Sequence, residues 1–362
     1  MLRLATAFSG IGAVEHALKR MHVKHKLIFA CDSDPYVKKS FFANYNIDDS
    51  RWFDLVQNIN GKKFKGKVDL FVGGTPCQSF SLVGKRRGFK DARGTLFYEF
   101  ARLVDEIKPR AFIFENVKGL LSHDSGKTWE VIQSIFKGLG YNYYSQVLNA
   151  REYGMPQNRE RLFVVGFREN KDYKFPDPIE LKIAMQDLLD DSINSKYYLP
   201  EKGIKFVTSQ KNLDKKYTQI NGQVALCQKA NQQFNWHGDF IFEPAGQVLE
   251  KYFLSDKVAK YVMATGTKNF YSKPETDLAV ARPLLATMAK MHRAGVDNYI
   301  TRSGRIRKLS PRECLRLMGF DDTFKIVVSD TQMYRQAGNS IVVNVLMSVL
   351  RNMGIGATKI DL

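Results

Sequence analysis

Cysteine and histidine are scarce in this chain. There are four cysteines and six histidines in 362 residues, with no Cys-x-x-Cys pair and no histidine spacing typical of metal ligands. These numbers argue against a disulfide scaffold and against a zinc site. We therefore expect no bound metal and a reducing, intracellular environment.

Long apolar runs are also absent. No run approaches the roughly 18–20 residues that a membrane span needs. The first eight residues are too short for a signal peptide and read instead as a buried strand. The composition, 44% hydrophobic and 25% charged, is that of a globular protein with no membrane contact. A chain of this length has room for one large core and a second, smaller lobe.

Acidic side chains are few relative to basic ones. The chain has 37 Asp and Glu against 55 Lys and Arg, a formal net charge of +18. Such a surplus favours a polyanionic partner, most commonly nucleic acid, over a basic surface kept for solubility. Residues 171–305 hold 20 basic and 15 acidic side chains, so most of the surplus lies elsewhere.

Strand-like and helix-like stretches alternate through the first 170 residues. This pattern predicts an α/β fold with a doubly wound, mostly parallel sheet and helices on both faces. Ligands of such sheets bind beyond the carboxyl ends of the strands. The expected strands are 2–8, 26–31, 68–73, 111–115, 143–149 and 161–167, and the expected helices are 13–21, 35–45, 94–107 and 128–139.

The patterning changes after about residue 171. Residues 173–303 lack clean periodicity and predict a separate, irregular lobe, whereas helical patterning returns within 307–320 and 333–350. We expect a catalytic domain over 1–172, a recognition domain over 173–303, and a hinge and return to the catalytic domain over 304–362.

A glycine motif, Phe8-Ser9-Gly10-Ile11-Gly12, follows the first expected strand. Glycines at this place let the backbone approach a ligand, although a plain tight turn would look the same. Asp32 ends the second strand, where an acid binds ribose hydroxyls or, alternatively, caps the next helix. The pair indicates an adenosine-containing cofactor, either a dinucleotide or S-adenosylmethionine.

Two reactive side chains follow further strands. Cys77 lies in the polar segment Gly74-Thr75-Pro76-Cys77-Gln78-Ser79, which favours a nucleophile over a buried structural cysteine. Glu115 ends the strand 111–115, from which a carboxylate reaches the same edge of the sheet. Taken alone, Glu115 would be read as a cap or a surface acid.

Three further segments carry polar side chains. The loop 84–94 is basic and bounded by glycines, which suits phosphate contacts but also describes a solvated loop. Arg159 and Arg161 are two residues apart and point the same way in an extended chain, unless they form an edge-strand ion pair. Asn339, in Gly-Asn-Ser, interrupts two helix-like stretches, as a plain turn would.

Together these segments resemble the DNA cytosine-5 methyltransferase family of restriction–modification systems. The resemblance covers roughly residues 1–170 and 304–352, whereas 173–303 matches in position alone. It implies a Rossmann-like S-adenosylmethionine methyltransferase fold with a smaller target-recognition lobe. The shared segments, in the family's order, are FSGIGA, GTPCQSFS, GKRRGFKDARGTLF, ENV, QNRERLF, RKLSPRECLRLMGF and QAGNSIVVNVL.

The resemblance also implies roles for individual residues. The implied catalytic residues are Cys77, Glu115, Arg159 and Arg161. The implied cofactor-binding residues are Phe8, Gly10, Gly12, Asp32, Asp54 and Asn339. The implied nucleic-acid-binding residues are Ser81, Lys85, Arg86, Arg87 and Arg93. Asp54 is placed by position alone. Asp32 stands where a longer glutamate is common, and Ser33 stands where a bulkier residue often packs on the adenine.

The implied activity is methyl transfer from S-adenosylmethionine to carbon 5 of a flipped-out cytosine in a short sequence of double-stranded DNA, through a covalent bond to Cys77. We expect a monomer, and a restriction endonuclease for the same site is a candidate partner.

Three alternatives differ in partner or class. A tRNA cytosine-5 methyltransferase would share the catalytic core. A catalytically silent cofactor-binding regulator would not need Cys77, Glu115 and Arg161 together. A nicotinamide-dependent dehydrogenase would need a pattern closer to Gly-x-Gly-x-x-Gly and leaves Pro76-Cys77-Gln78 unexplained.

Overall fold

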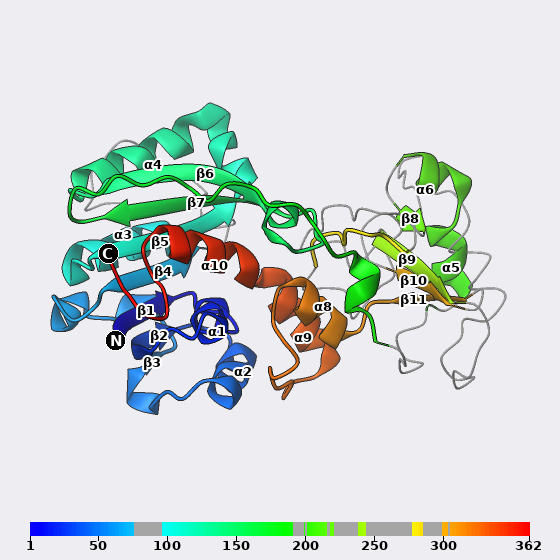
Figure 1. The fold of residues 1–362 in the computed structure, drawn as a ribbon, viewed down its shortest axis with the longest axis horizontal. Helices are drawn as coiled ribbons and strands as arrows, with labels where there is room; N and C mark the ends of the chain where they lie inside the picture. The colour runs from blue at the N-terminus through cyan, green and yellow to red at the C-terminus, as the bar shows by residue number, and fades with distance from the viewer. Residues whose placement is uncertain are drawn as a thin grey trace. The chain divides into compact units, whose positions relative to one another are not determined.

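The structure is a computed structural model that describes residues 1–75, 96–190, 199, 201–215, 218–220, 238–243, 277–284, 299–302 and 305–362. The chain divides into two compact units, and Figure 1 shows the elements of both. The first unit comprises Met1–Leu148, Glu160–Asp177 and Val345–Leu362. The second comprises Asn149–Arg159 and Pro178–Asn344.

A seven-stranded sheet forms the centre of the first unit, in the order β3-β2-β1-β4-β5-β7-β6. The pairs β3–β2, β2–β1, β1–β4 and β4–β5 are parallel, and β7 runs antiparallel to β5. The strands are β1 Leu2–Ala7, β2 His25–Cys31, β3 Trp52–Phe53, β4 Leu70–Gly74, β5 Ala111–Val117, β6 Asn142–Asn149 and β7 Glu160–Phe167. The expected α/β fold with a mostly parallel sheet is confirmed.

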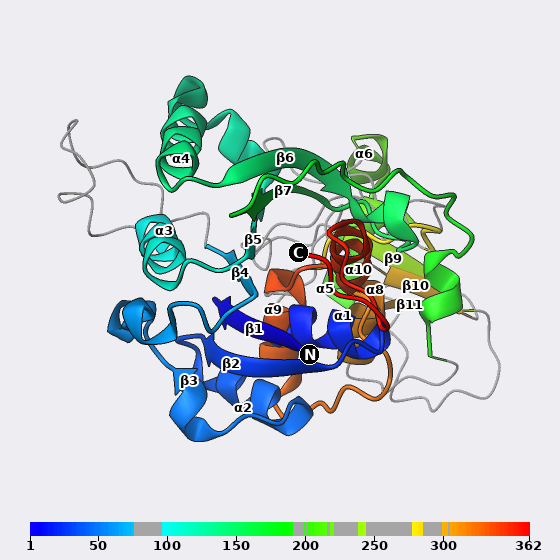
Figure 2. The same ribbon diagram turned by 60° about the vertical axis from the view of Figure 1, so that its left-hand side comes forward.

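Helices cover both faces of this sheet. Figure 2 shows α3 and α4 on one side and α1 and α10 on the other, as crossovers in opposite directions from β1 and β4 require. The helices are α1 Ala13–Arg20, α2 Pro35–Asn44, α3 Leu96–Ile107, α4 Lys127–Gly138 and α10 Val343–Asn352. Asp34 and Pro35 define the start of α2, because the Asp34 carboxylate accepts from the Tyr36 N–H.

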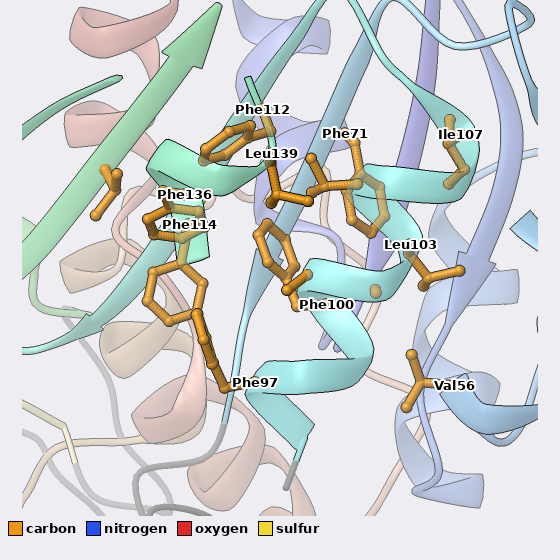
Figure 3. Close-up of a cluster of buried hydrophobic side chains, with 14 of the residues drawn as sticks. Val56, Phe71, Phe97, Phe100, Leu103, Ile107, Phe112, Phe114, Phe136 and Leu139 are labelled. Atoms are coloured by element: carbon orange, nitrogen blue, oxygen red, sulfur yellow. The ribbon is translucent and has the colours of Figure 1, made fainter. Parts of the chain in front are cut away.

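Phenylalanines fill the space between the sheet and α3 (Figure 3). On α3, Phe97 and Phe100 are three residues apart and therefore share the buried face. Phe100 stacks on Phe71 of β4, with 5.0 Å between ring centroids, and Phe112 of β5 packs at the same distance against Phe136 of α4. This core packs β4 against α3 and β5 against α4.

The second unit contains a four-stranded sheet in the order β11-β10-β9-β8. Its β8–β9 and β9–β10 pairs are parallel and its β10–β11 pair is antiparallel. The strands are β8 Thr218–Ile220, β9 Gly238–Glu243, β10 Tyr299–Arg302 and β11 Arg305–Lys308, and the helices are α5 Glu201–Val207, α6 Gln210–Asp214, α8 Pro311–Leu317 and α9 Asp330–Asn339. Within the described ranges, no helix has the length and apolar character to cross a membrane.

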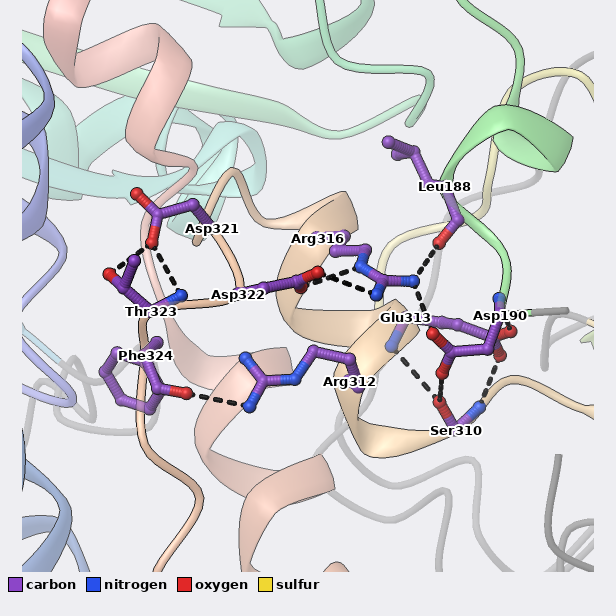
Figure 4. A network of polar contacts seen from close by, with 10 residues as sticks. All are labelled: Leu188, Asp190, Ser310, Arg312, Glu313, Arg316, Asp321, Asp322, Thr323 and Phe324. Carbon is purple, nitrogen blue, oxygen red and sulfur yellow. Dashed lines mark hydrogen bonds and ion pairs between the residues drawn. The ribbon is translucent and has the colours of Figure 1, made fainter. Parts of the chain in front are cut away.

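Helix α8 is the centre of a polar network in the second unit (Figure 4). Ser310 and Glu313 form a capping box, and the Glu313 carboxylate accepts from the backbone N–H groups of Ser310, at 2.7 Å, and Asp190, at 2.8 Å. Arg316 bridges Asp190 at 2.7 Å and Asp322 at 2.8 Å. The network ties Asp190 to both the first and the last turn of α8, although Asp190 lies far from this helix in the sequence.

Candidate functional site

The carboxyl ends of the parallel strands gather several of the expected site residues at one edge of the sheet. The chain leaves β1 toward β2 on one side and later places β4 on the other side, so the strand order reverses between β1 and β4. Ligands of doubly wound sheets bind at this reversal. The segments that leave the sheet there are Phe8–Gly12 and the chain after Gly74.

The Phe8–Gly12 loop has an unusual backbone. Phe8, Gly10 and Gly12 have φ of 55°, 53° and 79°, the left-handed region. A Cβ on Gly12 would lie 2.2 Å from the Tyr45 ring, whereas a Cβ built on Gly10 would have no atom of the described residues within 4 Å, apart from its neighbours in the chain. Gly12 is therefore closely packed, and no other described residue occupies the space beside Gly10.

Asp32 lies directly beyond β2 and binds this loop. Its carboxylate accepts from the Gly10 N–H at 2.9 Å and from the Asp34 N–H at 3.1 Å. Since Asp34 is the N-cap of α2, the capping interpretation of Asp32 is wrong. An acid directly beyond the second strand of such a sheet is placed to accept from ribose hydroxyls. This position, beside the Phe8–Gly12 loop, fits an adenosine-containing cofactor.

Asp54 lies directly beyond β3, the strand beside β2, so both acids stand at carboxyl ends of neighbouring strands. Its carboxylate accepts from the Trp52 indole N–H at 2.9 Å. The sequence pattern did not predict the two-residue strand β3.

Cys77 and the basic-loop residues Ser81, Lys85, Arg86, Arg87 and Arg93 lie outside the described residues. Gly74 and Thr75, which lead to Cys77, are described. Asn116 of β5 is buried and donates to the Thr75 carbonyl at 2.9 Å. Asn116 thus holds the backbone two residues before the cysteine. This role was not predicted, although an amide inside an apolar strand is a signal for it.

Glu115 and Arg161 face each other across β5 and β7. Arg161 Nε lies 3.4 Å from Glu115 Oε1, and their side chains are 16% and 12% exposed. On the other side, a Cβ on Gly74 would stand 2.9 Å from Glu115 Oε2. Glycine at position 74 therefore lets the Glu115 carboxyl lie against the end of β4.

Arg159 contacts different partners from Arg161. It is buried, precedes β7 and belongs to the second unit. Its Nη2 donates to the carbonyls of Gly338, at 3.1 Å, and Ser340, at 2.9 Å, on either side of Asn339 at the end of α9. Arg159 therefore holds the Gly-Asn-Ser turn.

Two of the other cysteines are poor nucleophiles. Cys31 and Cys314 are buried. Burial, followed by the nearby charges of Asp32 and Asp54, raises the pKa of the Cys31 thiol to about 12. Cys227 lies outside the described residues.

Known proteins match the chain over nearly its whole length. Residues 2–354 match the family described as C-5 cytosine-specific DNA methylase. The orphan methyltransferase M.SPRI of Bacillus phage SPR is 32% identical, over 97% of each chain. The type II methyltransferase M.HhaI of Haemophilus parahaemolyticus is 31% identical, over 98% of this chain and 94% of its own.

Among solved structures, the Entamoeba histolytica methyltransferase EhMeth aligns with a TM-score of 0.67 and 16% identity, over 98% of both chains. This likeness supports the methyltransferase fold. The resemblance drawn from the sequence motifs is thus confirmed, and the chain belongs to the C-5 cytosine-specific DNA methylase family as a DNA (cytosine-5-)-methyltransferase.

Proposed function

We propose that this enzyme transfers a methyl group from S-adenosylmethionine to carbon 5 of a flipped-out cytosine in a short sequence of double-stranded DNA, through a covalent bond to Cys77. The observation that carries the proposal is the Glu115–Arg161 pair, 3.4 Å apart, beside the strand end that leads to Cys77. The pair puts an acid and a guanidinium at the ligand edge of the sheet, next to the strand after which the expected nucleophile follows in the sequence.

The chemistry assigns a task to each of these side chains. Carbon 5 of cytosine is a poor nucleophile until the Cys77 thiolate adds to carbon 6 and makes the ring enamine-like. Glu115, in its protonated form, donates to ring nitrogen 3 as negative charge develops there. Arg161 binds the ring carbonyl oxygen and orients Glu115. Once carbon 5 has bonded to the methyl group, loss of the carbon 5 proton to water and elimination of the Cys77 thiolate restore the ring.

In this proposal the Phe8–Gly12 loop, Asp32 and Asp54 of the first unit bind the cofactor. The resemblance to the family gives Asn339 of the second unit a cofactor-binding role as well. S-adenosylmethionine supplies an electrophilic methyl group on a sulfonium. The Asp32 carboxylate, which accepts from the Gly10 N–H, would also accept from its ribose, and glycine at position 10 would let the cofactor approach the backbone. Arg159 supports the turn that carries Asn339.

Residues 173–303 would select the target sequence, and the loop 84–94 would contact DNA phosphates. The support for the loop is its charge, since it lies next to Cys77 in a chain of net charge +18. Charge reversal at Arg86 and Arg87 should flatten the slope of log affinity against log salt concentration. An unchanged slope would remove this loop from the phosphate contacts.

Mapping of modified bases tests the reaction and the substrate together. The protein is incubated with S-adenosylmethionine and either random-sequence duplex DNA or a transcribed tRNA pool, and 5-methylcytosine is mapped at base resolution. We expect methylation of DNA in one short sequence context. Methylation of the tRNA pool alone would favour the tRNA alternative, and methylation of neither would contradict the proposed activity.

A duplex with 5-fluorocytosine at the mapped target then tests the covalent step. Fluorine does not leave as a proton does, so elimination should stall and a protein–DNA adduct should survive denaturing electrophoresis. Peptide mass analysis should place the adduct on Cys77. Cys77→Ser should form no adduct and show no turnover, because a hydroxyl is far less ionised than a thiol. An adduct on Cys31, Cys227 or Cys314 would sink the assignment.

A further inference from the structure

Glu15 is an acid buried in the apolar surroundings of the first helix. It is the third residue of α1 and only 1% exposed. Gly12, at the N-cap, supplies no capping side chain. Within the described residues, Glu15 Oε2 is buried and has no hydrogen-bond partner. An unpartnered polar atom in the interior lowers the stability of the fold, so its presence points to a role other than stability.

A chain of hydroxyl contacts links Glu15 to the glycine loop. Glu15 Oε1 lies 3.2 Å from Thr6 Oγ1 of β1, which lies 2.8 Å from Ser9 Oγ. Ser9 Oγ donates to the Cys31 carbonyl at 3.1 Å and accepts from the Cys31 N–H at 2.9 Å. The contacts therefore join the end of β1, the loop and the end of β2.

The link from Glu15 to Thr6 exists in either protonation form of the carboxyl. The Cys31 carbonyl already accepts from the Ser9 N–H at 2.9 Å, so the hydroxyls of Ser9 and Thr6 can donate along the chain of contacts to an ionised Glu15. A protonated Glu15 instead donates to Thr6 and leaves the two hydroxyl protons for the other two contacts. Burial raises the pKa of Glu15 to about 7, which favours the protonated form below neutral pH.

The Phe8–Gly12 loop, at the other end of these contacts, has a backbone conformation that needs stabilising interactions. Phe8 has φ of 55°, a costly conformation for a residue with a side chain, and it lies one residue from Ser9. Gly10, on the other side of Ser9, donates its N–H to Asp32. We infer that Glu15 is a positioning residue that holds the Phe8–Gly12 loop and the end of β2 in the geometry that binds the cofactor. The inference rests on the proposed function of this loop.

Calorimetric titration with S-adenosylmethionine tests the inference on the full chain. Glu15→Ala should weaken binding about tenfold, the effect of one lost hydrogen bond. Thr6→Val removes the same link with little change of shape and should give a similar loss. The double variant should be no weaker than either single variant, because both break one chain. Glu15→Gln should bind within about twofold of the wild type, since its amide N–H can donate to Thr6.

Leu18→Ala is the matched control, because Leu18 is fully buried on the same helix. It should lower the melting temperature and leave the cofactor affinity unchanged. Unchanged affinity in a folded Glu15→Ala protein, or losses from Glu15 and Thr6 that add, would overturn the inference. If Glu15→Ala does not fold, Thr6→Val and Glu15→Gln decide it. No binding by the wild type would overturn the proposed cofactor site itself.

Discussion

Two helices of this protein carry a buried glutamate at the same position of the first turn, but the two glutamates have different hydrogen-bond partners. Glu15 and Glu313 are each the third residue of their helix, α1 and α8, and each is at most 1% exposed. Glu313 accepts from two backbone N–H groups and belongs to a capping box. Glu15 meets one hydroxyl through Oε1 and has no capping partner at Gly12.

Glu313 therefore serves as a helix cap, whereas Glu15 does not cap its helix and has a different role. Both oxygens of Glu313 accept from backbone N–H groups, so the fold uses this side chain as a hydrogen-bond acceptor at the helix start. The raised pKa of Glu15 means that its carboxylate form is opposed by the fold at neutral pH. Glu15, whose carboxylate form is disfavoured, is the acid that is linked to the Phe8–Gly12 loop.

Removal of the capping glutamate should produce the largest effect. Glu313→Ala leaves the N–H groups of Ser310 and Asp190 without their acceptor, and we expect a loss of roughly 4 kcal/mol in the free energy of unfolding. Urea denaturation measures it. A loss below about 1 kcal/mol would show that the hydrogen bonds of Glu313 stabilise the fold no more than those of Glu15, and the two glutamates would then not differ in this respect.

Unlike Glu313→Ala, Glu15→Gln should raise the free energy of unfolding above that of the wild type as pH rises toward neutral. The folded-state pKa of Glu15 is raised from 4.5 to about 7, so between these values the folded state keeps a proton that the unfolded state releases. The free energy of unfolding therefore falls as pH rises through this window, by roughly 3 kcal/mol in total. The glutamine side chain of the variant has no such proton to lose, so the variant should gain stability over the wild type up to about pH 7.

Urea unfolding of both proteins at about pH 5 and about pH 8, on either side of most of this window, gives the measurement. Parallel changes in the two proteins would mean that Glu15 does not titrate in this window, and the comparison with Glu313 would then lose its electrostatic basis.

A pair of aspartates extends the comparison to ligand binding, with a smaller effect. Asp32→Ala removes the acid beyond β2 and should weaken S-adenosylmethionine binding by about 2 kcal/mol. Asp190→Ala removes an ion pair with Arg316 in the α8 network. It should cost about 1 kcal/mol of stability or less and leave cofactor affinity unchanged. Calorimetry on both folded variants distinguishes the two regions, and equal affinities would contradict the role of Asp32.

Local patterning predicted most of the sheet, because apolar runs and helix-start signals each extend over only a few consecutive residues. The strand at Leu2–Ala7 and the helix at Pro35–Asn44 agree with the expected 2–8 and 35–45 to within a residue. Strand β3 escaped prediction because two residues carry no periodicity.

Long-range contacts escaped for a different reason. The bond from Arg159 to the Ser340 carbonyl spans 181 residues, and spacing within an extended segment does not reveal such a partner. Asn116 was overlooked because its partner is a backbone carbonyl, which every residue has. Glu15 was not among the residues that the sequence singled out, since burial of one carboxyl cannot be read from an amphipathic pattern.

The antiparallel pairing of β7 with β5 makes strand register part of the chemistry. Glu115 pairs with Phe163 and Val117 with Arg161, so Glu115 and Arg161 lie diagonally on one face of the sheet. A slip of one residue would turn Arg161 to the opposite face. A sheet misaligned in this way would still have a hydrogen-bonded backbone, but its acid would be separated from the guanidinium. Catalysis therefore needs the correct register of β7 against β5 as well as a folded sheet.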